Sequence, residues 1–229
     1  MKNRARVVVL LVTCSVAGTT DGARAEKLRR ADEIKICIQP LGKYDSRLLE
    51  VGGRGIEYLF GFSVEVLEAR TLPKKAYYAP RKRYRAEKLL EHIDEKIVPG
   101  SGCTAVVGFT RVDISTTKGK RKDWGILGLG MIDGTSAVVS SYRLGRGKAS
   151  RRKVMKRTVK VMNHELGHVL GLEHYNVAGC LMHDAMGTVK TVDEEHGLLC
   201  ERSRRLIEKK HHVRLPEHDE FDWSQVLEE

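Results

Sequence analysis

The 229-residue sequence has little of several features that mark other classes of protein. Aromatic residues make up 6% of it and do not interleave with the basic runs, so we expect no base-stacking surface and no nucleic-acid partner. The apolar run at residues 7–17 is too short to span a bilayer well. We find no internal repeat, low-complexity tract or linker. These absences predict one substantial domain, with no transmembrane segment once a leader is removed.

The first 25 residues have the pattern of a secretory signal peptide: a basic start, the apolar run and an Ala23-Arg24-Ala25 cleavage site. The mature chain would begin near Glu26 in an exported protein, either periplasmic or secreted. An uncleaved short anchor and lipidation at Cys14 are the alternatives. Removal of the leader would leave four cysteines, an even number that is compatible with disulfides outside the cytosol.

The most informative stretch is residues 164–174, which fits H-E-x-x-H-x-x-G-x-x-H at every specified position. On a helix, His164 and His168 lie one turn apart on the same face, so both imidazoles can reach one Zn²⁺. Gly171 stands where the helix should end, because glycine adopts a positive φ cheaply. The returning chain would then bring His174 to the same ion as its third ligand.

Three nitrogen ligands would leave a fourth position on the metal for water, whose pKa zinc lowers to about 7. Glu165 directly follows the first histidine, and its carboxylate can lie beside the metal without binding it. It is placed to accept the proton of the water and to deliver it to a leaving amine. The pattern therefore predicts a catalytic zinc site with Glu165 as general base.

Hydrophobic patterning around this motif predicts alternating strands and helices. We expect strands at residues 34–40, 63–67, 104–113, 126–131 and 135–142, helices at 47–60, 84–93 and 150–171, and loops at 71–83 and 115–122.

Asp133-Gly134 between the last two strands is a strong hairpin signal. We therefore expect an α/β fold with a mixed, mostly parallel sheet that has one antiparallel strand, and with the site on the last long helix. The expected organisation is a signal peptide at 1–25, the domain at 26–212 and an acidic tail at 213–229, which Trp223 could anchor to the domain.

Together with Cys180-Leu181-Met182 and Cys200, the histidine motif resembles the signature of the archaemetzincins, a family of zinc metallopeptidases. Residues 36–42, 109–113 and 139–144 also resemble segments of that family, so the resemblance covers roughly residues 34–203.

The resemblance implies a single metzincin-like zinc-protease domain in which His164, His168 and His174 bind catalytic zinc. It implies in addition that Glu165 is the general base and that Met182 forms a methionine turn beneath the metal. Aminopeptidase-like trimming of short peptides is a further implication of the family.

The chain departs from the family signature at two positions. Four family cysteines, which together bind a second zinc, would fall at 175, 180, 200 and 203, but Tyr175 and Ser203 replace two of them. A structural zinc needs four closed ligands, so we expect one zinc per chain. The alternative is a second site completed by His183 and His196.

We expect the two remaining signature cysteines, Cys180 and Cys200, to form a disulfide in an exported protein. Cys37 and Cys103 lie in or beside predicted strands, where we expect buried thiols. The alternative for these two residues is a second bridge, between Cys37 and Cys103.

The leading hypothesis is a monomeric zinc-dependent peptidase acting on peptide or protein substrates, which would pair with the free edge of a strand at residues 124–131. The sequence does not choose between aminopeptidase and endopeptidase. One alternative is a non-catalytic, zinc-stabilised binding module of the cell envelope. Another is an interaction protein that acts through the basic surface implied by the net charge of +11. The presence of Glu165 favours the enzyme.

Overall fold

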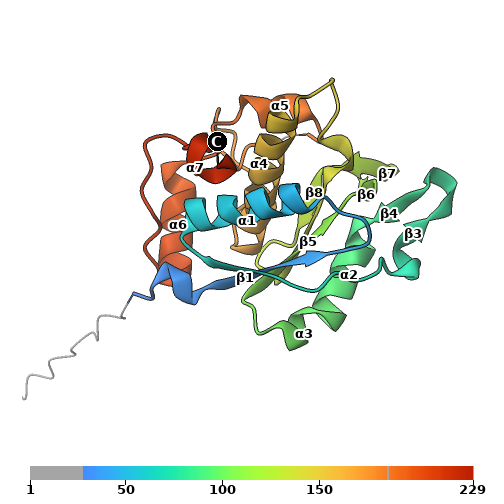
Figure 1. The fold of residues 1–229 in the computed structure, drawn as a ribbon, viewed down its shortest axis with the longest axis horizontal. Coiled ribbons are helices and arrows are strands. Elements are labelled where there is room, and N and C mark those ends of the chain that lie inside the picture. Colours follow the sequence, from blue (N-terminus) through green and yellow to red (C-terminus); the bar gives the residue numbers. More distant parts are fainter. Residues whose placement is uncertain (1–27, 185, 229) are drawn as a thin grey trace, which may run out of the picture.

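The structure, a computed structural model, describes residues 28–184 and 186–228 (Figure 1). The expected signal peptide and Cys14 lie outside the described residues. The helices are α1 (Ser46–Phe60), α2 (Ala86–Lys96), α3 (Val98–Ser101), α4 (Arg151–Val169), α5 (Val189–Glu194), α6 (Glu201–His211) and α7 (Trp223–Leu227). The strands are β1 (Lys35–Pro40), β2 (Ser63–Val66), β3 (Tyr77–Tyr78), β4 (Arg83–Arg85), β5 (Ala105–Thr110), β6 (Ile114–Lys118), β7 (Arg121–Ile126), β8 (Gly128–Gly130) and β9 (Ser136–Ser140).

The main sheet has five strands in the order β2-β1-β5-β9-β8. Neighbouring strands are parallel except β8, which runs antiparallel to β9 at the edge of the sheet. The expected hairpin lies between β8 and β9, where Asp133 adopts a positive φ of 57°. The prediction of a mixed, mostly parallel sheet with one antiparallel member is confirmed.

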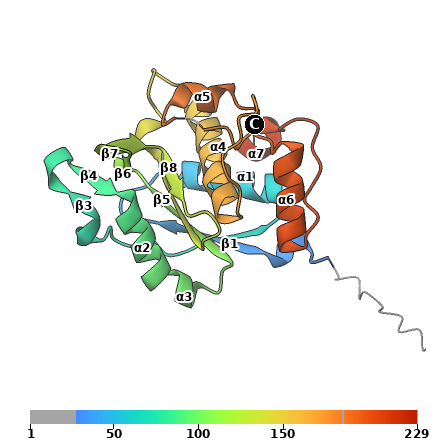
Figure 2. The ribbon, with the colours of Figure 1, turned by 180° about the vertical axis from the view of Figure 1, so that it is seen from behind.

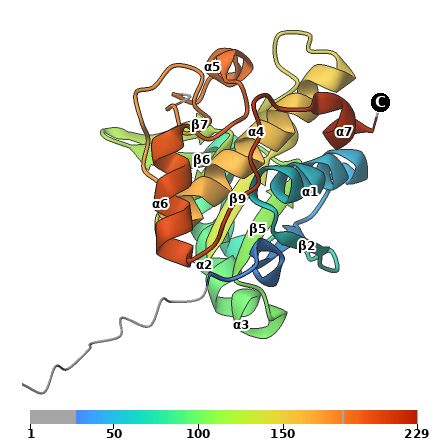
Figure 3. The same cartoon turned by 90° about the vertical axis from the view of Figure 1, so that its left-hand side faces the viewer.

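Helices cover both faces of this sheet, with α1 and α4 on one face and α2 on the other (Figures 1 and 3). Alternate residues of a strand point to opposite faces, which explains the division of the core. On β1, Ile36 and Ile38 pack in the cluster that includes the buried side chains of α1 and α4. Cys37, between them, packs in the cluster that includes α2. Helix α4 thus lies on one face of the sheet, with β8 at the sheet edge.

A second sheet, in the order β3-β4-β6-β7, was not expected. Residues 115–122 were predicted to form an exposed basic loop, and that prediction was wrong, because they form most of the antiparallel β6–β7 hairpin. The hairpin pairs Ile114 with Ile126 at its buried end, whereas its lysine-rich tip is exposed. A half-buried hairpin with a charged tip has the composition of a loop, which is why hydrophobicity did not reveal it.

The acidic segment after residue 212 packs back onto the domain (Figure 2). Phe221, Val226 and Leu227 are buried, and the Arg54 guanidinium of α1 donates a hydrogen bond to the Val226 carbonyl at 2.8 Å. Trp223 lies against Phe221, with 4.2 Å between ring centroids. No helix within residues 28–184 and 186–228 is long and apolar enough to cross a membrane.

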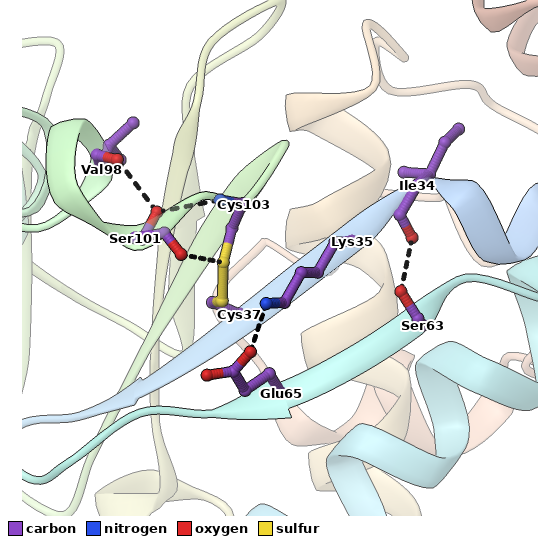
Figure 4. Close-up of a disulfide and its surroundings, with 8 residues drawn as sticks. All are labelled: Ile34, Lys35, Cys37, Ser63, Glu65, Val98, Ser101 and Cys103. Carbon is purple, nitrogen blue, oxygen red and sulfur yellow. Dashed lines mark hydrogen bonds and ion pairs between the residues drawn. A yellow bond between two sulfur atoms is a disulfide. The ribbon is translucent and has the colours of Figure 1, made fainter.

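The cysteines pair differently from the prediction. Cys37 and Cys103 form a disulfide (Figure 4). Cys180 and Cys200 are free thiols, so the predicted Cys180–Cys200 bridge was wrong. Strands β1 and β5 are neighbours, which brings the Cα atoms of Cys37 and Cys103 to 5.9 Å. The order of parallel strands decides this pairing, and the sequence alone does not give that order.

Reduction of the Cys37–Cys103 bridge should lower the free energy of unfolding by about 4 kcal/mol, because it frees a loop with a sequence separation of 66 in the unfolded chain. Urea unfolding with and without a reductant measures the change. A Cys103→Ala variant should lose its response to the reductant, and a Cys200→Ala variant should keep it. Non-reducing peptide mapping that joins Cys180 to Cys200 would contradict the assignment.

Candidate metal centre and cleft

Helix α4 carries the first part of the histidine motif. It begins as expected at Ser150, whose hydroxyl accepts a hydrogen bond from the Lys153 amide at 3.2 Å. The helix ends at Val169, and Gly171 follows with a φ of +95°. A Cβ on Gly171 would meet only the ends of exposed side chains that can move, those of Asp133 and Lys210, so it is the positive φ that requires glycine here.

The three motif histidines converge after this turn. The Nε2 atoms of His164 and His168 lie 3.1 and 3.2 Å from the Nε2 atom of His174. These separations are close to the edge of a tetrahedron around an ion with Zn–N bonds of about 2.0–2.1 Å. Among the described residues, this trio is the group of metal-ligating side chains close enough to hold an ion, with all its ligand atoms within 4.8 Å of one another.

Hydrogen bonds to carbonyl groups fix the orientation of two of the rings. The Nδ1 atom of His164 lies 2.6 Å from the Leu181 carbonyl oxygen, and that of His168 lies 2.8 Å from the Leu172 carbonyl oxygen. A carbonyl oxygen can only accept, so Nδ1 carries the proton and Nε2 presents its lone pair to the centre. The donor set fits a zinc ion.

Burial keeps these rings neutral, which is the form that binds a metal. Burial first, and then the neighbouring His168, lower the pKa of His164 to about 3. Burial is also the main reason that the pKa values of His168 and His174 lie below their ordinary range. Only His174 is exposed, so it forms the accessible side of the centre.

Glu165 belongs to helix α4, and its side chain packs against strand β8. Only 8% of it is exposed, and this burial raises the pKa of its carboxyl group to about 8, against a hydrogen bond from the Gly130 backbone amide that lowers it. A Cβ on Gly128 would lie 2.5 Å from Glu165 Cγ. Gly128 therefore leaves room for the Glu165 side chain, and the backbone amide of Gly130 orients its carboxylate.

Met182 packs beneath the centre, as the family resemblance implied. It is fully buried, and a Cβ on Gly167 would lie 2.5 Å from its sulfur. Gly167 lies between the two helical ligands in sequence, so the methionine touches the helix directly under them. The neighbouring Leu181 supplies the carbonyl that orients His164.

Two of the four cysteines of the family signature, Cys180 and Cys200, lie close together in the structure. Ser203 lies where a cysteine is expected, with its hydroxyl 3.2 Å from the sulfur of Cys200 and 4.0 Å from that of Cys180. His183 and His196 do not join the two thiols in a cluster of ligands within residues 28–184 and 186–228. Instead, the Cys180 sulfur accepts the Cys200 backbone amide at 3.4 Å, next to the start of α6.

A cleft of about 430 Å³ opens beside the histidines. Its walls come from α4, from β8, from the β6–β7 hairpin and from the segment that contains α5. Lys118, Asp184 and Glu195 also line the cleft, although the histidine motif did not reveal them. They reach the cleft through the unexpected hairpin and through the fold of residues 184 and 186–195, for which the sequence carries no spacing signal.

The sequence matches a family profile described as peptidase family M54 over residues 58–209. It is 30% identical to the archaemetzincin of Haloarcula marismortui over 177 residues, which cover 74% of this chain and 97% of that protein. It is 34% identical to the archaemetzincin of Archaeoglobus fulgidus over 167 residues, or 73% of this chain and 94% of that protein.

Solved structures agree with these likenesses. The crystal structure of the Archaeoglobus fulgidus archaemetzincin, complexed with malonate, matches with a TM-score of 0.64 at 30% identity and covers 76% of this chain and 99% of its own. That of the Methanopyrus kandleri archaemetzincin matches with a TM-score of 0.67 at 25% identity, covering 77% and 94%. They confirm the expected fold class.

The geometry predicts one tightly bound zinc per chain. Elemental analysis of the purified protein should find one ion, and His164→Ala should lose it, because two nitrogen ligands hold zinc poorly. Cys200→Ser, which alters the remnant of the second site, should keep the full content. Two ions per chain, with one lost in Cys200→Ser, would instead indicate a second site at the thiols.

Proposed function

We propose, from the premise that the chain belongs to peptidase family M54 and is a zinc metallopeptidase, that His164, His168 and His174 hold its catalytic zinc and that Glu165 is the general base. The observation that carries the proposal is the convergence of three Nε2 atoms beside a buried carboxylate at the wall of a cleft. When bound, zinc supplies a water molecule with a pKa of about 7 and polarises the peptide carbonyl.

The chain itself would then position and move protons. Glu165 accepts a proton from the attacking water and delivers it to the leaving amine. The backbone amide of Gly130 donates a hydrogen bond to the carboxylate, so that this group is oriented before substrate binds. Because the site is buried, the positive charge of a bound metal would act strongly on Glu165 and lower its pKa from about 8.

An extended peptide would lie along β8, which is the end strand of its sheet and lines the cleft. Backbone groups on the outer edge of such a strand can pair with a substrate chain, as the sequence suggested for residues 124–131. The family resemblance favours removal of residues from the amino end of short peptides. Equal cleavage of a peptide and its N-acetylated form would argue against that finer assignment.

We also propose that the protein is exported. The leader pattern at residues 1–25 and the Cys37–Cys103 bridge support this, because disulfides persist mainly outside the reducing cytosol. N-terminal sequencing of protein recovered from cell fractions tests it, and cytosolic protein that retains residue 1 would exclude export.

Glu165→Gln should retain zinc but lose about 10²–10⁴-fold in kcat, because the amide has nearly the same shape and cannot accept the proton of the water. Peptide cleavage and zinc content, measured on the same preparation, separate this outcome from loss of the metal. Near-normal turnover would remove Glu165 from the mechanism. Zinc binding without cleavage in the parent protein would indicate a non-catalytic binding module.

Gly128→Ala should lower kcat by about 10²-fold, because its Cβ would force the Glu165 side chain from its position and a displacement of about 1 Å can have such an effect. Gly145→Ala is the matched control, since a Cβ there meets nothing within 4 Å. Zinc content should be unchanged in both variants. Equal activity of the two would show that the Gly128 contact does not position the base.

A further inference from the structure

A second carboxylate, that of Glu195, lines the cleft and has no role in the steps proposed above. The residue directly follows α5 and is only 5% exposed. Its Oε1 atom is buried and has no hydrogen-bond partner in the described part of the chain. A buried carboxylate without a partner is costly, so its retention at the wall of a substrate cleft needs an explanation.

The nearby lysine does not provide that partner. The Lys160 ammonium on α4 donates hydrogen bonds to the backbone carbonyls of Val192, at 2.8 Å, and of Glu195 itself. Within the described residues, no ion pair joins the Lys160 ammonium to the Glu195 carboxylate. Burial raises the pKa of Glu195 to about 8, although the charge of Lys160 acts in the opposite direction. A cation entering from the cleft would provide a partner for this carboxylate.

The position of Glu195 indicates which substrate residue would reach it. Val161 lines the same cleft one helical turn before Glu165, and the Lys160 hydrogen bonds hold residues 192 and 195 against that part of α4. Glu165 must lie beside the leaving amine, because it delivers the proton to that nitrogen. The side chain of the residue that contributes the amine would therefore extend along α4 toward Val161 and Glu195.

The chemistry of this end of the cleft fits a long cationic side chain. Val161 and Val192 supply apolar walls for an aliphatic stem, and the Glu195 carboxylate lines the same cleft and could bind its charged end. We propose that Glu195 determines specificity by binding the charged end of a lysine or arginine directly after the scissile bond. This inference rests on the proposed peptidase function and names the substrate class of that same cleft.

The test uses zinc-loaded enzyme and peptides that differ only in the residue after the scissile bond: arginine, norleucine or glutamate. Arginine should exceed norleucine by about 10–100-fold in kcat/KM, as expected for a hydrogen-bonded charge pair. In Glu195→Gln this preference should fall below about 3-fold, with little change for the norleucine peptide. Glu195→Lys should favour the glutamate peptide.

Glu194→Gln is the matched control, because this neighbouring side chain is 64% exposed and, within the described part of the chain, pairs only with Lys190 at the surface, at 3.9 Å. It should keep the arginine preference of the parent. Zinc content and thermal unfolding of each variant identify any that fail to fold, and the arginine-to-norleucine ratio of the parent enzyme tests the inference without a variant.

The outcomes separate the two proposals. If the zinc-loaded parent cleaves none of the peptides, the proposed peptidase function fails. If it cleaves them without an arginine preference, or if the preference survives in Glu195→Gln, the role of Glu195 is overturned. Two further outcomes would overturn the placement of the side chain. One is a preference for arginine only before the scissile bond, and the other is a preference that depends on a free α-amino group in the peptide.

Discussion

The close approach of helix α4 to strand β8 is the constraint on which the site depends. A Cβ on Gly130 would collide with the Glu165 carbonyl oxygen, so β8 can approach this turn of α4 only because residue 130 is a glycine. The strand also lies against His168, since a Cβ on Gly130 would lie 3.0 Å from the Cβ of that residue. Burial lowers the pKa of His168 and raises that of Glu165. The imidazole is thereby kept neutral, and the carboxyl group gains a stronger affinity for protons. One packing contact thus acts on both a candidate ligand and the candidate base.

The sequence predicted the elements whose signals are local. The start of the long helix at residue 150, the spacing of the histidines and the glycine at 171 all depend on the geometry of one helix, and each was found where expected. The β8–β9 hairpin also followed from its Asp133-Gly134 turn. Regular periodicity and strong turn residues therefore sufficed to place the long helix and the outer strand.

The features that the sequence did not reveal depend on contacts between distant segments. The Cys37–Cys103 bridge requires β1 and β5 to be neighbours, which is a matter of strand order. The β6–β7 hairpin is polar enough to have the composition of a loop, so the wall it contributes to the cleft was missed. Glu195 lies outside every motif and gains its environment only when α5 packs beside α4.

The hydrogen bonds of Lys160 have a consequence for how the cleft can change. Its ammonium binds the Val192 and Glu195 carbonyls at the carboxyl end of α5, where a cation also interacts favourably with the helix dipole. Lys160 belongs to the helix that carries two of the candidate metal ligands, so the backbone at residue 195 is fixed to the catalytic helix independently of its own side chain. Substitution of the Glu195 side chain can then alter the lining of the cleft without moving the backbone that carries it. The fold therefore has a position at which substrate preference can change while the metal centre is preserved.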